Sequence, residues 1–77
     1  MNQDMPLAMV VPGKLVTVTE VRDGRGLQRR LADMGLTLGV QIRVINGQMS
    51  GPVLIDLRGS RVALGRGIAQ KIVVKEM

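Results

Sequence analysis

The chain of 77 residues has room for one domain spanning 1–77, and with 45% apolar and 22% charged residues it is expected to fold. It contains no Cys, His, Phe, Tyr or Trp, which excludes disulfides, thiolate or imidazole zinc sites, thiol and imidazole catalysts, and aromatic stacking platforms for single-stranded nucleic acid. The net charge of +5 favours either an anionic partner or a charged surface that keeps a small domain soluble.

The segment before residue 14 lacks the features of a signal peptide. It has no positively charged start and contains Asp4, Pro6 and Pro12. Nothing in the sequence approaches the ~20 consecutive apolar residues that a membrane-spanning helix needs. We therefore expect a cytoplasmic protein that does not itself span a membrane.

The first predicted strand runs from Lys14 to Arg22, after a turn at Pro12-Gly13. Val16 and Val18 share one face of this strand. Continued alternation would point Glu20 inward with the valines, so the phase must change there. The sequence therefore predicts a β-bulge near Glu20.

Residues Asp23 to Met34 have the spacing of one short helix. Leu27, Leu31 and Met34 stand at i, i+4 and i+7, which places them in one apolar stripe. Asp23 is the expected N-cap, because a carboxylate there accepts free backbone N–H groups and is favoured by the helix dipole.

The end of this helix is marked by Gly35, which fits the left-handed position just past the last turn. Leu36 is then expected to fold back on Leu31 in a Schellman motif. Beyond it, Leu38-Gly39 predicts a second turn, and Val40 to Val44 alternate as a half-buried strand.

Two turn signals compete after this strand. Asn46-Gly47 is a strong hairpin dipeptide, but Gly51-Pro52 follows closely. We favour a longer loop that runs from Gly47 to Pro52.

Residues Val53 to Leu64 form the clearest hairpin. Gly59-Ser60 fits a two-residue type II′ turn, because that turn takes Gly at its first central position. This turn predicts a register in which Arg58 lies opposite Arg61. Every cross-strand pair in that register agrees in polarity.

The remaining chain supplies one more strand. Gly65 to Gln70 is either a turn of helix or a loop, and Lys71 to Lys75 is the last strand. The fold class is therefore mainly β, with about five short strands and one short helix after the first strand. This pattern predicts a small, strongly curved β-barrel.

Motifs that carry chemistry are scarce. Gly24-Arg25-Gly26 and Gly65-Arg66-Gly67 resemble the start of a phosphate-binding loop, but neither has the Lys-Ser/Thr of a P-loop, and we interpret both as turns. The six carboxylates are scattered along the sequence, whereas a hard-cation site needs several converging oxygens. We therefore expect no enzyme, no cofactor and no tight metal site.

The predicted helix combines an apolar stripe with a basic cluster, so it is the favoured partner-binding face. Leu27 lies near its glycine-weakened start and would form an apolar anchor with a charged rim. The alternative is that Leu27 is an ordinary core residue. The candidate contacts on the helix are Leu27, Arg25, Arg29, Arg30 and Met34. If the helix is not the docking face, the next candidates are Arg58, Arg61 and the loop from Gly47 to Pro52.

Several short segments stand in a recognisable order along the chain. They are Pro6-Leu7, Pro12-Gly13-Lys14, Leu27, the run from Arg30 to Gly39, Ile42-Val44, Gly51-Pro52, Ala63-Leu64 and the run from Ala69 to Val74. In this order and spacing they resemble the FeoA family, small cytoplasmic proteins of bacterial ferrous iron uptake, over nearly the whole chain. One departure is that Gly51 and Pro52 are adjacent, whereas the family commonly has a residue between them.

The resemblance implies an SH3-like β-barrel and a non-catalytic accessory role. Such a protein would bind and modulate the FeoB-type membrane GTPase transporter, and would reach the inner face of the cytoplasmic membrane through that partner. The family is often labelled as binding transition metals, a label that the absence of His and Cys does not support.

A basic SH3-like nucleic-acid-binding module is the alternative function, because the fold and the charge permit it. The missing aromatic side chains and the interspersed acids argue against it, so nucleic acid is not an expected partner. Self-association is expected to be weak.

Overall fold

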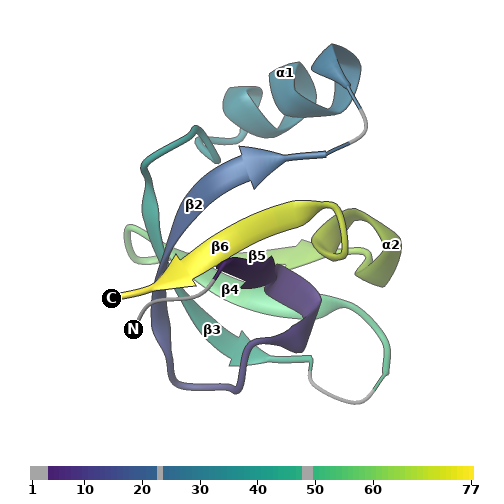
Figure 1. Ribbon diagram of the computed structural model, residues 1–77. Coiled ribbons are helices and arrows are strands. Elements are labelled where there is room, and N and C mark those ends of the chain that lie inside the picture. The colour runs from purple at the N-terminus through teal and green to yellow at the C-terminus, as the bar shows by residue number, and fades with distance from the viewer. Residues whose placement is uncertain (1–3, 23, 48–49) are drawn as a thin grey trace.

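The computed structural model describes residues 4–22, 24–47 and 50–77, in which six strands form one antiparallel sheet (Figure 1). The strands lie side by side in the order β1-β6-β2-β3-β4-β5. The elements are β1 (Asp4–Pro6), the 3₁₀ turn η1 (Leu7–Met9), β2 (Leu15–Val21), α1 (Arg25–Asp33), β3 (Gln41–Asn46), β4 (Val53–Leu57), β5 (Ser60–Leu64), α2 (Arg66–Ala69) and β6 (Ile72–Glu76).

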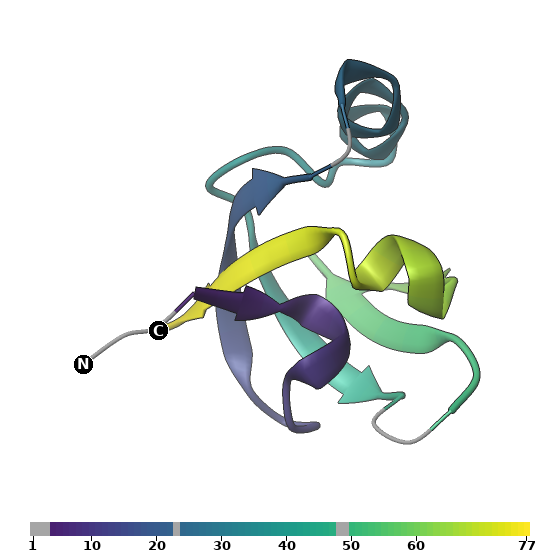
Figure 2. The same cartoon turned by 45° about the vertical axis from the view of Figure 1, so that its right-hand side comes forward.

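The sheet curls strongly but does not close into the predicted barrel (Figure 2). Among the described residues, the strand pairs leave β1 and β5 as the two edges. The extra strand is β1, which pairs with β6 from Asp4 opposite Lys75 to Pro6 opposite Val73. It is too short to show alternation, and Pro6 is tolerated because β1 is an edge strand. The helix α1 therefore follows the second strand and not the first.

The predicted bulge in β2 is confirmed. The register between β2 and β6 shifts between Val18 and Glu20. Glu20 is consequently exposed and Val21 is half-buried, so the strand keeps its apolar side chains inside despite the broken alternation.

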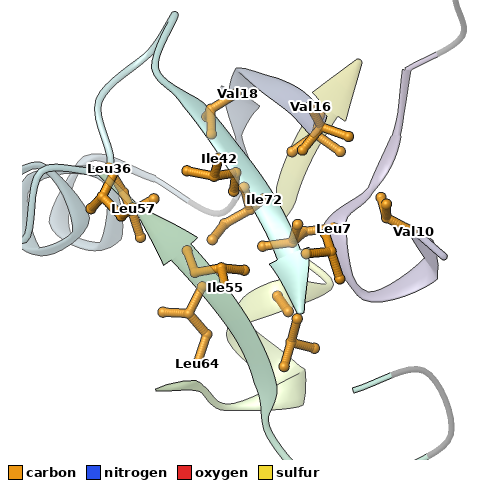
Figure 3. Close-up of a cluster of buried hydrophobic side chains, with 14 of the residues drawn as sticks. Leu7, Val10, Val16, Val18, Leu36, Ile42, Ile55, Leu57, Leu64 and Ile72 are labelled. Carbon is orange, nitrogen blue, oxygen red and sulfur yellow. The ribbon is translucent and has the colours of Figure 1, made fainter. Parts of the chain in front are cut away.

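In the described part of the chain, aliphatic side chains fill the inside of the curled sheet, and no polar or charged residue is buried there (Figure 3). Leu7 from η1, Ile55 from β4 and Ile72 from β6 are 0% exposed. Burial of each such side chain stabilises the fold by about 1.5–3 kcal/mol. The segment before β2 thus contributes core residues that its irregular sequence did not predict.

The C-terminal end of α1 forms the predicted Schellman motif. Gly35 has a φ of 94°, its N–H donates to the Ala32 carbonyl at 2.9 Å, and the Leu36 N–H donates to the Leu31 carbonyl at 2.9 Å. Leu31 and Leu36 both lie in the buried core. At the other end the N-cap residue is Gly24, without a side-chain cap, and the predicted cap Asp23 lies outside the described residues.

The predicted register of the β4–β5 hairpin is wrong. Asp56 lies opposite Arg61, and Leu57 lies opposite Ser60, so the two-residue turn is Arg58-Gly59. Both turn residues have positive φ, 53° and 88°, which is the type I′ pattern. The Asp56 carboxylate supports this turn by accepting the Gly59 N–H at 2.8 Å.

The other predicted connections agree with the structure. β3 ends at Asn46 and β4 begins at Val53, so the longer loop is confirmed over the tight Asn46-Gly47 hairpin. The segment 65–70 contains the short helix α2, which was one of its two predicted forms.

Candidate functional site

The arginines of this chain fall into two groups according to their side-chain partners. Arg22 lies 3.9 Å from Glu20, Arg43 donates to the Gly13 carbonyl at 3.0 Å, and Arg66 donates to two carbonyls described below. The arginines without a side-chain hydrogen bond or ion pair to any described residue are Arg25, Arg29, Arg30, Arg58 and Arg61. These free arginines are the ones that the sequence proposed for partner binding.

The helix α1 lies at one end of the molecule, beyond the end of β2 (Figures 1 and 2). Leu31 is 2% exposed and anchors the helix to the core. Leu27, one turn earlier, is half-buried and packs against the same core. Leu27 therefore packs on the core with part of its side chain and leaves the rest exposed, and its role in partner binding stays a prediction.

The free arginines of α1 do not form one ring around Leu27. At 100° per residue, Arg25 and Arg29 lie about 160° from Leu27 around the helix axis, whereas Arg30 lies about 60° from it. Consistent with this geometry, Arg25 and Arg29 line one shallow hollow together with Gln28 and Ala32. The helix thus presents two separate basic surfaces: Arg30 beside the apolar stripe, and Arg25 with Arg29 on the opposite face.

Two large apolar side chains are exposed where α1 leads into β3. Met34, the C-cap residue, is 45% exposed, and Leu38 is 51% exposed. The sequence proposed Met34 but missed Leu38, which it used only to mark a turn. The position of Leu38 in a predicted turn could have indicated its exposure, because a turn residue lies on no strand or helix face that packs against the core.

The hairpin tip lies against this same connection. A methyl group built on Gly35 would stand 3.2 Å from Leu57 Cδ2, so the end of α1 packs on the end of β4. Gly39 and Arg58 also line one common hollow. The fold thereby brings Arg58 near the exposed end of α1, while Arg61 lies along β5 opposite Asp56.

The loop between β3 and β4 is tied to α2. Arg66 donates from Nε to the Gly51 carbonyl at 3.1 Å and from a terminal nitrogen to the Gly47 carbonyl. The end of β3 and the start of β4 lie on the side of the sheet away from α1 (Figure 1). The loop candidate is therefore separate in space from the helix candidate.

Within the described ranges, no group of three or more acidic side chains gathers in a way that could hold a metal ion. That the protein binds no transition metal tightly stays a prediction. No helix in the described part of the chain combines the length and the apolar character that a membrane crossing requires.

Residues 5–76 match the model of the FeoA domain. The chain belongs to the FeoA family. It is 42% identical over 71 residues to a protein of Methanocaldococcus jannaschii named provisionally as Fe(2+) transport protein A, covering 92% of this chain and 85% of the relative. Ferrous iron transport is thus the activity with which this FeoA-family chain is associated.

Solved structures share its SH3-like fold. A crystal structure of an iron uptake regulatory protein, FeoA, has a TM-score of 0.87 at 32% identity, covering 97% of this chain and 99% of that one. The solution structure of FeoA from Chlorobium tepidum has a TM-score of 0.83 at 27% identity, covering 95% and 70%. A manganese-dependent transcriptional repressor has a TM-score of 0.85 at 24% identity, and the match covers 44% of it. This last likeness concerns the fold alone.

Proposed function

We propose that this FeoA-family chain is a non-catalytic, cytoplasmic accessory protein of ferrous iron uptake that binds and modulates a FeoB-type membrane GTPase transporter. Family membership supports the transport role. The absence of His and Cys from the sequence supports a role without acid–base or nucleophilic catalysis.

One observation carries the choice of a protein-binding role. Exposed apolar side chains lie at the end of α1 and in the turn after it, and free arginines lie on the same helix and at the hairpin tip that packs near Gly35. An apolar centre with a charged rim is the usual anatomy of a protein interface. We define the docking surface as Leu27, Arg30, Met34, Leu38 and Arg58. In it Leu27, Met34 and Leu38 provide the apolar centre, and Arg30 and Arg58 steer an acidic partner surface.

Nucleic acid binding is the second candidate, and the free arginines are the observation that favours it. Charge-driven binding of this kind weakens steeply as salt rises. Without aromatic side chains the protein has no stacking contact to replace the lost electrostatic attraction. A gel shift that persists at physiological salt would therefore favour this candidate over transporter binding.

The proposed function is tested by co-purification of the tagged chain with the full-length transporter in detergent, together with the GTPase rate with and without the chain. We expect a stable complex and a changed GTPase rate. R30Q/R58Q should weaken the complex, mainly by slower association at low salt. R25Q/R29Q removes the same charge from the other face of α1 and should bind like wild type. A wild-type chain that does not co-purify would contradict the proposal.

A further inference from the structure

The face of α1 opposite the apolar stripe is basic and unpartnered. Arg25 and Arg29 stand one turn apart, are exposed, and have no side-chain partner among the described residues. Asp33 follows Arg29 at i+4, yet no ion pair joins them. Because guanidinium groups are planar donors that match phosphate geometry, this pair is free to take an anionic ligand.

The hollow between these arginines has a composition that suits a polar ligand. It is lined by Arg25, Gln28, Arg29 and Ala32. The short side chain of Ala32 occupies little of the hollow, and the Gln28 amide adds a hydrogen-bond donor. Met34, a large exposed apolar residue, lies elsewhere, at the C-cap of the helix.

We propose that this face of α1 binds the anionic phospholipid headgroups of a bilayer. The inference rests on the proposed function, because a module docked on a membrane transporter lies close to the bilayer. Docking through the end of α1 leaves Arg25 and Arg29 uncovered, since they lie about 160° around the helix from Leu27. One helix would then contact the transporter with one face and the lipid surface with the other.

Charge complementarity favours a bilayer over the other anionic partners. A protein interface needs an apolar centre, and the lining of this hollow contains no large apolar side chain. Binding of single-stranded nucleic acid usually adds aromatic stacking, for which this chain has no residue. A headgroup layer needs neither, because it is polar, anionic and contacted by basic residues through charge.

The test uses the full chain and vesicles without transporter, so its result is independent of the docking proposal. Vesicles of phosphatidylcholine with about one-third phosphatidylglycerol are compared with pure phosphatidylcholine vesicles by co-sedimentation at low salt. We expect binding to the anionic vesicles only. R25Q/R29Q should lower the partition coefficient by about 25-fold, since one basic residue near an anionic surface contributes about fivefold.

The matched control is R58Q/R61Q, which removes the same net charge from the hairpin. It should bind anionic vesicles nearly like wild type. Equal losses in both variants would overturn the proposal, because the net charge and not this face would then drive binding. Failure of the wild type to bind anionic vesicles would also overturn it. Unchanged vesicle binding of R25Q/R29Q would overturn the proposal as well. If that variant also lost transporter binding, this face of α1 would contact protein and not lipid.

Discussion

The backbone N–H of Leu36 donates to the carbonyl of Leu31 across the left-handed Gly35, at 2.9 Å. This hydrogen bond turns the chain back at the end of α1, so that both leucines enter the core. The same turn leaves Met34 before it and Leu38 after it exposed. The exposure of these two apolar residues of the proposed docking surface thus follows from how the helix ends.

Gly35→Ala should destabilise the protein by about 1–2 kcal/mol. Gly35 has a φ of 94°, and the added methyl group would stand only 3.2 Å from Leu57 Cδ2. The control is Gly26→Ala inside α1, where a Cβ meets open space and Ala is the better helix former by about 1 kcal/mol. Thermal melting should show opposite shifts for the two variants. Shifts of the same sign would contradict the described end of the helix.

Arg58→Asn should stabilise the hairpin by about 0.5–1 kcal/mol. Arg58 has a φ of 53°, and Asn-Gly is the preferred pair for a type I′ turn. In the alternative register, with Gly59-Ser60 as the turn, Arg58 would be a strand residue and Asn there would destabilise it. The melting temperature therefore distinguishes the two registers by the sign of its change.

Arg66→Lys should destabilise the protein by about 1–2 kcal/mol, because a single ammonium cannot reproduce the fork that reaches the Gly47 and Gly51 carbonyls. Arg29→Lys makes the same chemical change where the side chain has no described partner. It should leave the free energy of unfolding, measured by chemical denaturation, unchanged. If Arg66→Lys also unfolds like wild type, the tie between α2 and the loop contributes nothing to stability.

The isolated protein should bind ferrous or zinc ions no more tightly than about 1 mM, the weak end of sites built from oxygen ligands. The reason is the ligand inventory, which has six carboxylates and no imidazole or thiol. Calorimetric titration at neutral pH measures this directly. A stoichiometric site with micromolar affinity would contradict it.

The hairpin shows why a local pattern can predict a fold and still miss a register. Moving the turn from Gly59-Ser60 to Arg58-Gly59 changes each cross-strand partner by two residues, and side chains alternate with a period of two. Ile55, for example, faces Val62 where the predicted register placed Leu64, and both are apolar. Polarity therefore could not separate the two registers, and the positive φ of Arg58 has no sequence signal of its own.

Elements with strong local signals were predicted correctly, including the bulge near Glu20 and the Gly35 cap. The candidate site could be predicted only in part, because its properties depend on distant segments. Arg66 is engaged since the fold brings the Gly47 carbonyl to it from 19 positions away. Arg58 lies near α1 because Leu57 packs under Gly35. Neither contact can be predicted from the spacing of residues in the sequence.

The central claim is that the exposed end of α1 docks the transporter. Its most direct test is the dissociation constant of the chain for the detergent-solubilised transporter, measured by titration for M34Q/L38Q and for the control M9Q/V11Q. Met9 and Val11 are 69% and 51% exposed, so both variants replace one exposed Met and one exposed aliphatic residue. We expect M34Q/L38Q to weaken binding at least tenfold, as loss of an apolar anchor does, and M9Q/V11Q to bind within about twofold of wild type, with unchanged melting temperatures for both. Wild-type affinity in M34Q/L38Q, or an equal loss in both variants, would contradict the claim.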